Sequence, residues 1–218
     1  SRSSKLVHGG LRYLKEGDLK TTLHSVRERN RLLHEAPGLV EPQSFLFADC
    51  AGRKPSRWLM QTGLVVYDLM AGNRRSRGGH FHADLAATQM LAPGLAPPGL
   101  RGALVFQDAK TDDARLVLRV LQEARRQGAT TLNYLAAQTL TFEQSRVTGL
   151  ELQDTLDGQR YTVRARCVVN ATGAWADRLR TGTGAPPLLR PLRGSHLVVP
   201  FWRLPVAQSI SFMHPQDG

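Results

Sequence analysis

Residues 167–177, Cys-Val-Val-Asn-Ala-Thr-Gly-Ala-Trp-Ala-Asp, constrain the fold of this chain more than any other stretch. The run from Cys167 to Val169 is fully apolar, which is typical of a strand buried on both faces of a parallel sheet. Side chains then shrink abruptly, and Gly173 can supply a positive φ or a close approach without a Cβ. We therefore expect a buried strand that ends in a loop on which a large flat ligand can lie. An ordinary buried strand and turn is the alternative.

Three further blocks accompany this stretch. Residues 3–14 read Ser-Ser-Lys-Leu-Val-His-Gly-Gly-Leu-Arg-Tyr-Leu, residues 112–118 read Asp-Asp-Ala-Arg-Leu-Val-Leu, and residues 190–200 read Arg-Pro-Leu-Arg-Gly-Ser-His-Leu-Val-Val-Pro. The four blocks, in this order, resemble the FAD-dependent, quinone-linked glycerol-3-phosphate dehydrogenases of respiratory chains. The resemblance covers nearly the whole chain, and the first block is not a generic flavoprotein pattern.

The sequence departs from that family at both ends. In the family a first strand, a Gly-x-Gly-x-x-Gly turn and a helix precede the first block and carry the pyrophosphate, whereas this sequence begins inside the block. We therefore expect an internal fragment that lacks this unit and the C-terminal part. Removal of the first strand would take a pairing partner from residues 167–169, which are otherwise expected to be buried, and would expose edges and apolar faces to water. The fragment alone is expected to be inactive, to bind FAD weakly or not at all, and to aggregate.

The predicted fold class is α/β with α+β elements: an incomplete FAD/NAD(P)-binding-type domain followed by the start of an antiparallel-sheet substrate domain. Residues 1–185 are assigned to the FAD-binding domain, with a helical and irregular insertion over about 16–105, and residues 186–218 to the substrate domain. The first block should be a turn or short helix that ends at its Gly-Gly pair. Periodicity and caps predict the other elements: helices over 19–35, 57–70 and 113–127, an irregular stretch over 71–101, strands over 106–110, 130–135 and 194–199, and a hairpin of 147–152 with 160–163.

The resemblance implies which residues approach FAD. Gly9 and Gly10 would leave room for the flat isoalloxazine ring, although a plain turn would also explain them. Ser4 and Lys5 are expected near the flavin or the pyrophosphate. The remaining cofactor contacts implied by position in the family are Ala136, Ala137, Ala171, Thr172, Gly173 and Trp175.

Oxidation of a secondary alcohol by a flavin also requires a group that neutralises the substrate phosphate and one that accepts the hydroxyl proton. Arg12 suits the phosphate, because a guanidinium can bind it bidentately, although a surface arginine is the commoner case. The family places the Arg and His of the first block at the substrate end of the flavin, so His8, Arg12 and Tyr13 are the candidate catalytic residues. Arg193 is a further candidate for substrate binding.

The chain has 29 Lys and Arg against 18 Asp and Glu, a net charge of +11. Such a balance suits anionic substrates, an anionic membrane surface or nucleic acid, but no regular aromatic pattern accompanies it and we expect no nucleic-acid partner. Cys50 and Cys167 do not form a disulfide framework, and Cys167 is expected to be buried. His80 and His82 lack convergent acids or cysteines, so we expect no metal.

The helix predicted at 57–70 is apolar around much of its circumference, and Arg74, Arg75 and Arg77 follow it. It can pack into the protein or dip into a bilayer interface. The resemblance implies the substrate glycerol 3-phosphate, the electron acceptor quinone, and a peripheral position on the cytoplasmic face of the cytoplasmic membrane. Two other functions stay open: a flavin-dependent amine or amino-acid oxidase, and a basic binding module without catalysis.

Overall fold

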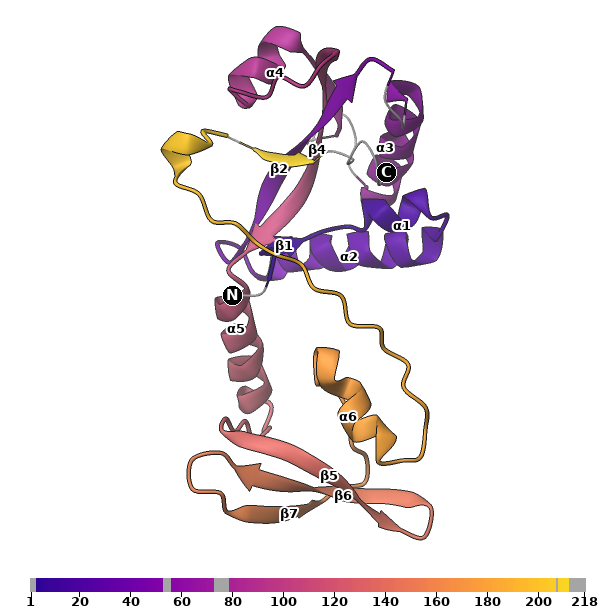
Figure 1. Cartoon of the computed structure of the whole chain (residues 1–218), viewed down its shortest axis with the longest axis vertical. Coiled ribbons are helices and arrows are strands. Elements are labelled where there is room, and N and C mark those ends of the chain that lie inside the picture. The colour runs from indigo at the N-terminus through magenta and orange to yellow at the C-terminus, as the bar shows by residue number, and fades with distance from the viewer. Residues whose placement is uncertain (1–2, 53–55, 73–78, 207, 212–218) are drawn as a thin grey trace. The chain divides into compact units, whose positions relative to one another are not determined.

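The computed structural model describes residues 3–52, 56–72, 79–206 and 208–211. The chain divides into two compact units, residues 1–122 with 198–218, and residues 123–197. The elements are β1 (Leu6–Val7), α1 (Leu11–Lys15), α2 (Leu19–Glu35), β2 (Val40–Cys50), α3 (Arg57–Ala71), β3 (Phe81–Asp84), α4 (Leu85–Leu91), β4 (Leu100–Thr111), α5 (Asp113–Arg126), β5 (Leu135–Glu143), β6 (Arg146–Asp154), β7 (Arg160–Arg164), η2 (Gly173–Trp175), α6 (Ala176–Thr181), η3 (Phe201–Arg203) and β8 (Ser209–Ser211) (Figure 1).

The first unit is built on the long antiparallel pair of β2 and β4. Strand β4 also pairs with β1 and β3, and β8 lies parallel to β2. Phe45 and Phe106 stand opposite each other in the β2–β4 register, and their rings stack at 5.4 Å between centroids. This sheet therefore gives the β1 segment, which leads into the first sequence block, a fixed neighbour in β4.

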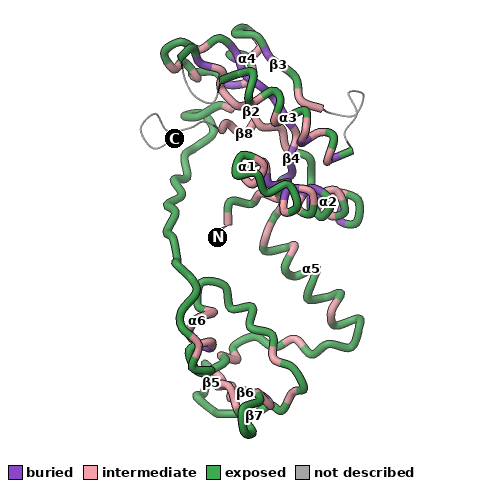
Figure 2. Tube along the Cα trace, turned by 90° about the vertical axis from the view of Figure 1, so that its right-hand side faces the viewer, coloured by how far each residue is buried: buried purple, intermediate pink, exposed green. Residues whose placement is uncertain are grey.

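Both faces of this sheet are covered. On one face, Leu64 of α3 packs against Leu104 and Phe106 of β4. On the other face, Leu46 and Ala103 pack against the end of α4. Helix α2 joins the first layer through a contact cluster that it shares with α3, so the buried positions gather on β2, β4 and these helices (Figure 2).

The predicted helices are confirmed with nearly the expected bounds. Asp18 begins α2 by accepting the backbone N–H of Thr21 at 3.0 Å, and Ser56 begins α3 in the same way. Gly72 ends α3 with φ of 66°. Small polar caps and a terminal glycine are strong local signals, so these bounds could be found without tertiary information.

One local prediction in the insertion is wrong. Residues 71–101, expected to be irregular, contain β3 and α4. Asp84 caps α4 by accepting the N–H of Ala87 at 2.8 Å. The strand predicted at 106–110 is confirmed but is longer than expected, since β4 runs from Leu100 to Thr111. Glycine at 99 and 102 concealed its beginning, because glycine is unfavourable in strand interiors.

The second unit contains a three-stranded antiparallel meander, β5–β6–β7, and the short helix α6. The predicted hairpin of 147–152 with 160–163 is confirmed as β6 and β7. Residues 130–134 are not a strand, since β5 begins only at Leu135. Most positions of this unit are exposed (Figure 2).

The central strand predicted at 167–169 is wrong. These residues have no strand assignment, and Cys167 and Val169 are exposed rather than buried. An apolar run indicates what a segment can bury, but burial requires a facing strand, which the described residues do not provide.

Two other apolar segments lack the expected partners. Residues 194–199 form exposed coil instead of a strand. On α5, Val117, Val120 and Leu121 were expected on a buried side and are exposed. These apolar side chains recur with the helical period, as on a helix that packs against another surface. In the described structure, however, only Leu116 of α5 contacts a buried cluster. The domain boundary at 185/186 stays a prediction, and the compact units divide the chain at other positions.

Candidate functional site

The first block forms a strand, a glycine pair and a helix, so the predicted order, a helix ending at the glycines, is wrong. Leu6 and Val7 pair with Lys110 and Ala109 of β4, and Gly10 then begins α1 with φ of 80°. A positive φ is available to glycine without steric cost, so Gly10 turns the chain from strand into helix. The candidate residues Ser4 to Tyr13 thus lie on one short segment anchored to β4.

Gly9 lies against the core of the first unit. A Cβ at this position would lie 2.0 Å from Tyr67 Oη and 2.8 Å from Val26 Cγ2. Its N–H donates to Asp108 Oδ1 at 2.8 Å. The absence of a side chain at Gly9 is therefore required by Tyr67, whereas its predicted contact with a flavin ring stays a prediction.

Beneath the glycine pair lies a buried polar cluster of Arg29, Tyr67 and Asp108, which we call the Asp108 cluster. Arg29 Nη1 lies 2.9 Å from Asp108 Oδ1 and 2.9 Å from Tyr67 Oη, and the Tyr67 hydroxyl donates to the same carboxylate oxygen at 3.2 Å. Arg29 and Asp108 are only 3% and 5% exposed. Burial, and next the charge of Asp108, raise the pKa of Tyr67, so its hydroxyl keeps its proton.

No motif in the sequence points to this cluster. In the helix predicted over 19–35, Arg27, Arg29 and Arg31 read together as a solvated face, which is the usual case for charged side chains. That prediction is wrong for Arg29, which lies three residues after Val26 and so shares the buried face of α2. Asp108 likewise lies two residues after the buried Phe106 of β4, on the same face of the strand. In both cases the signal was a charged residue in register with apolar ones.

The two candidate polar side chains on either side of the glycine pair are exposed. His8 follows β1 directly. Arg12 is on α1, where its Nε lies 3.1 Å from Glu16 Oε1, and its side chain is 85% exposed. An exposed pair of this kind contributes little to stability, so Arg12 can exchange Glu16 for an anionic ligand at low cost.

Ser4 and Tyr13 frame the same segment. Ser4 is exposed and Tyr13 is half-buried. Lys5 has a positive φ of 58°, and its Nζ lies 2.9 Å from Asp113 Oδ1 at the start of α5. This hydrogen bond raises the pKa of Lys5, so the ammonium group stays charged.

In the second unit, the loop of residues 170–175 is organised by Asn170. Its Nδ2 donates to the carbonyl of Ala176 at 2.8 Å, and its Oδ1 accepts the Thr172 hydroxyl at 2.8 Å. Gly173 has φ of 59°, and a Cβ placed there would have no atom within 4 Å. The open backbone at Ala171, Thr172 and Gly173 fits the approach of a flat group such as FAD.

The other candidate residues of this unit are on β5, at the start of α6 and in the coil that follows α6. Ala136 and Ala137 are on β5, paired with Gln153 and Leu152 of β6, and α6 lies beside β5. Trp175 is half exposed at the start of α6. Arg193 is in exposed coil. The structure therefore groups Ala136, Ala137 and residues 171–175 within one unit.

Asp177 fixes the chain that leaves α6. Its carboxylate accepts the backbone N–H groups of Leu189 at 2.8 Å and Leu188 at 3.1 Å. These bonds, the one from Leu189 foremost, lower the pKa of Asp177. The carboxylate thus remains ionised at neutral pH and holds residues 188–189 against the helix that follows the loop.

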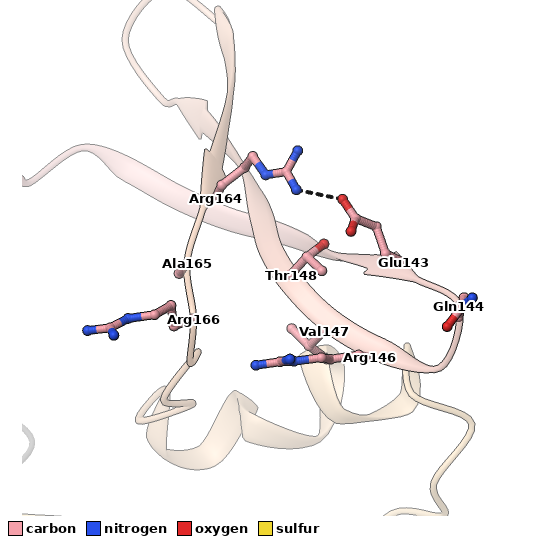
Figure 3. A pocket seen from close by; sticks show the side chains of 8 residues that line it. All are labelled: Glu143, Gln144, Arg146, Val147, Thr148, Arg164, Ala165 and Arg166. Atoms are coloured by element: carbon pink, nitrogen blue, oxygen red, sulfur yellow. Dashed lines mark hydrogen bonds and ion pairs between the residues drawn. The ribbon is translucent and has the colours of Figure 1, made fainter.

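A surface hollow of about 700 Å³ lies in the second unit, beside the turn between β5 and β6 and the last residue of β7. Figure 3 shows Arg164 turned toward Glu143, with which it forms an ion pair, while Arg146 and Arg166 extend away from that pair. Its lining among the described residues is Glu143, Gln144, Arg146, Val147, Thr148, Arg164, Ala165 and Arg166. None of these is a predicted site residue, so the hollow is separate from the candidate flavin contacts.

Among the described residues, no three His, Cys, Asp or Glu side chains lie close enough together to hold a metal ion. His80 Nδ1 instead lies 2.7 Å from Asp68 Oδ2, and His82 is 3.9 Å from Asp49. These histidines therefore face single carboxylates.

Comparison with known proteins identifies the class of protein to which this chain belongs. The family model described as "FAD dependent oxidoreductase" matches residues 1–217. The chain therefore belongs to the FAD-dependent oxidoreductase family, and FAD is the cofactor of that family, as the sequence predicted.

More specific similarities are to glycerol-3-phosphate dehydrogenases. The aerobic glycerol-3-phosphate dehydrogenases of Staphylococcus epidermidis and Staphylococcus aureus are 33% identical over the whole chain, which spans 40% of their length. The crystal structure of glycerol-3-phosphate dehydrogenase from Bacillus halodurans complexed with FAD matches all of this chain and 36% of that one, at TM-score 0.68 and 26% identity. The predicted resemblance to FAD-dependent glycerol-3-phosphate dehydrogenases is confirmed.

The fold is shared more widely. L-Proline dehydrogenase from P. horikoshii matches 75% of this chain and 41% of its own, with TM-score 0.57 and 17% identity. At this identity the match concerns the fold alone. The predicted α/β flavoprotein fold class is confirmed by these neighbours together with the mixed helices and sheets of the structure.

Proposed function

We propose that the protein oxidises sn-glycerol 3-phosphate to dihydroxyacetone phosphate with FAD, and that the electrons pass to a quinone. The observation that carries the proposal is the first block, where His8 and Arg12 are exposed on either side of a glycine pair anchored in the core. The relatives named as glycerol-3-phosphate dehydrogenases support the substrate. The quinone acceptor rests on the family resemblance.

Three parts of the chain would each have a separate role in this reaction. FAD, when bound, supplies the acceptor for the hydride from C2 of the substrate. The Arg12 guanidinium would bind the substrate phosphate, releasing Glu16. The His8 imidazole would accept the hydroxyl proton, because a neutral ring nitrogen can act as a general base. The open backbone of residues 171–173 would lie against the cofactor.

We further propose that the protein associates peripherally with the anionic cytoplasmic face of the cytoplasmic membrane. Helix α3 supports this, because Trp58, Leu59 and Leu69 are 81%, 64% and 76% exposed on the side opposite its buried Leu64 and Tyr67. Exposed apolar side chains on a basic protein suit an interfacial position. Within the described residues no helix is long and apolar enough to span a bilayer.

The test of substrate recognition is Arg12→Ala in the full-length protein. Flavin reduction by glycerol 3-phosphate should become at least about 30-fold less efficient, equivalent to about 2 kcal/mol for a charge-assisted pair. Reduction by glycerol, which has no phosphate, should change little. Arg31→Ala is the matched control, because Arg31 forms the same i,i+4 pair with Glu35 on α2. Equal losses on both substrates would show that Arg12 does not bind the phosphate.

An amine or amino-acid oxidase is the second candidate within this fold. No contact in the described structure favours a substrate amine over a phosphate, and the basic first block favours an anion. Reduction of the flavin by amino acids, with glycerol 3-phosphate inert, would support the oxidase instead.

A further inference from the structure

The Asp108 cluster is unusual for its place in the first unit. Arg29 and Asp108 form an ion pair with side chains 3% and 5% exposed, on a sheet face that is otherwise occupied by Leu104 and Phe106. Apolar side chains of similar volume often replace buried ion pairs with no loss of stability. Stability alone therefore does not account for a carboxylate at this position.

Three donors converge on one oxygen of that carboxylate. The Gly9 N–H, Arg29 Nη1 and the Tyr67 hydroxyl lie 2.8, 2.9 and 3.2 Å from Asp108 Oδ1. Hydrogen bonds to an ionised acceptor are stronger than those between neutral groups. The Gly9 amide is thus held by the strongest acceptor in its surroundings.

Arg29 is itself fixed from several sides. It donates to the carbonyl of Gln107 at 3.2 Å and to Asn30 Oδ1 at 3.0 Å, and Asn30 Nδ2 donates to the carbonyl of Ala71 at the end of α3. The cluster therefore ties α2, α3 and β4 to a single backbone amide. Because Arg29 is held by these bonds, it keeps the Asp108 carboxylate, and with it the Gly9 amide, in one position.

The amide it holds lies between the two exposed candidate residues. His8 precedes Gly9, and Arg12 is on the helix that Gly10 begins. Thr22, fully buried on α2, donates its hydroxyl to the carbonyl of Asp18 at 2.8 Å, and the same hydroxyl lies 3.5 Å from the Gly10 carbonyl. The backbone between His8 and Arg12 is therefore bonded to the core at Gly9 and lies against α2 at Gly10.

We infer that Asp108, fixed by Arg29 and Tyr67, is a positioning residue that sets the backbone of Gly9 and Gly10 and so the placement of His8 and Arg12 against the flavin. It does not touch the substrate, because it is buried beneath the glycine pair. This inference rests on the proposed function, since it assigns these two side chains to the site of flavin reduction.

The test compares Asp108→Asn and Tyr67→Phe with wild type in the full-length, FAD-loaded protein. Asparagine preserves shape but removes the charge, and phenylalanine preserves the ring while removing only the hydroxyl. Asp68→Asn is the matched control, because Asp68 pairs with His80 at 13% exposure on α3 without contacting the glycine pair. The readouts are amide hydrogen exchange, the flavin visible spectrum and the rate of flavin reduction.

We expect exchange at Gly9 and Gly10 to become at least tenfold faster in Asp108→Asn and about threefold faster in Tyr67→Phe, with β4 amides within twofold of wild type. The flavin spectrum should shift, and reduction by glycerol 3-phosphate should slow at least tenfold in Asp108→Asn. Asp68→Asn should leave all three readouts unchanged. If Asp108→Asn does not fold, Tyr67→Phe makes the same comparison with smaller effects.

Three results would overturn the inference. One is unchanged exchange at the glycine pair. Another is equal acceleration across β4 and α3, which indicates general loosening. The third is faster exchange at the glycines with an unaltered flavin spectrum and rate. If wild-type flavin is not reduced by glycerol 3-phosphate, the proposed function fails, while exchange and the spectrum still decide the role of Asp108.

Discussion

Substitution of Gly9 by alanine should destabilise the first unit by about 3 kcal/mol. The new Cβ would lie 2.0 Å from Tyr67 Oη and 2.8 Å from its Cζ, where ordinary contact is 3.4–4 Å. Tyr67 cannot move freely, because Arg29 and Asp108 bond its hydroxyl. Overpacking costs about 1–3 kcal/mol, and each strained bond to a charged partner adds about 1 kcal/mol or more.

The assay is hydrogen exchange of β4 amides in increasing urea, which gives the free energy of opening for this unit in the full-length protein. The matched control is Gly63→Ala on α3, where a Cβ would have no atom within 4 Å. That change should stabilise the helix by about 0.5–1 kcal/mol. Adding Tyr67→Phe to Gly9→Ala should recover part of the loss. A Gly9→Ala protein within 0.5 kcal/mol of wild type would refute the packing argument.

Two further predictions concern the cofactor loop and the membrane. Gly173→Val should abolish FAD retention in the full-length protein, because a β-branched side chain is strained at φ of 59° and would cover the open backbone; a Val variant that purifies folded and fully yellow would contradict the loop's role. Trp58→Ser with Leu69→Ser should reduce co-sedimentation with anionic lipid vesicles at least tenfold, since both side chains are exposed on α3. Equal sedimentation of variant and wild type would exclude this face as the membrane contact.

Sequence reasoning succeeded where the signals were local. Asp18, Ser56 and Gly72 mark helix ends by capping and by positive φ, and both act within a few residues. The hairpin of β6 and β7 is likewise signalled locally, because an Asp-Gly pair at 157–158 separates two β-rich runs. These features depend little on the rest of the fold.

It failed where burial depended on a partner element. Cys167 and Val169 have the composition of a buried strand but are exposed coil, because no described strand pairs with them. Arg29 reads as a surface residue but is buried, because Asp108 and Tyr67 compensate its charge. Composition describes each segment alone, whereas pairing is a property of two segments.

The candidate site shows the same division. The sequence brought His8 to Tyr13 together because they are consecutive, and the structure adds how their backbone is held. Gly9 was expected to be small for the sake of a flavin, yet the group that excludes a side chain there is Tyr67. A residue 58 positions away could not be inferred from spacing.

The most direct test of the proposed function is anaerobic mixing of the purified, FAD-loaded full-length protein with candidate substrates while flavin absorbance is followed. We expect rapid bleaching by sn-glycerol 3-phosphate with formation of dihydroxyacetone phosphate, slow bleaching by glycerol, and none by amino acids. Bleaching by an amino acid, with no response to glycerol 3-phosphate, would contradict the proposed function.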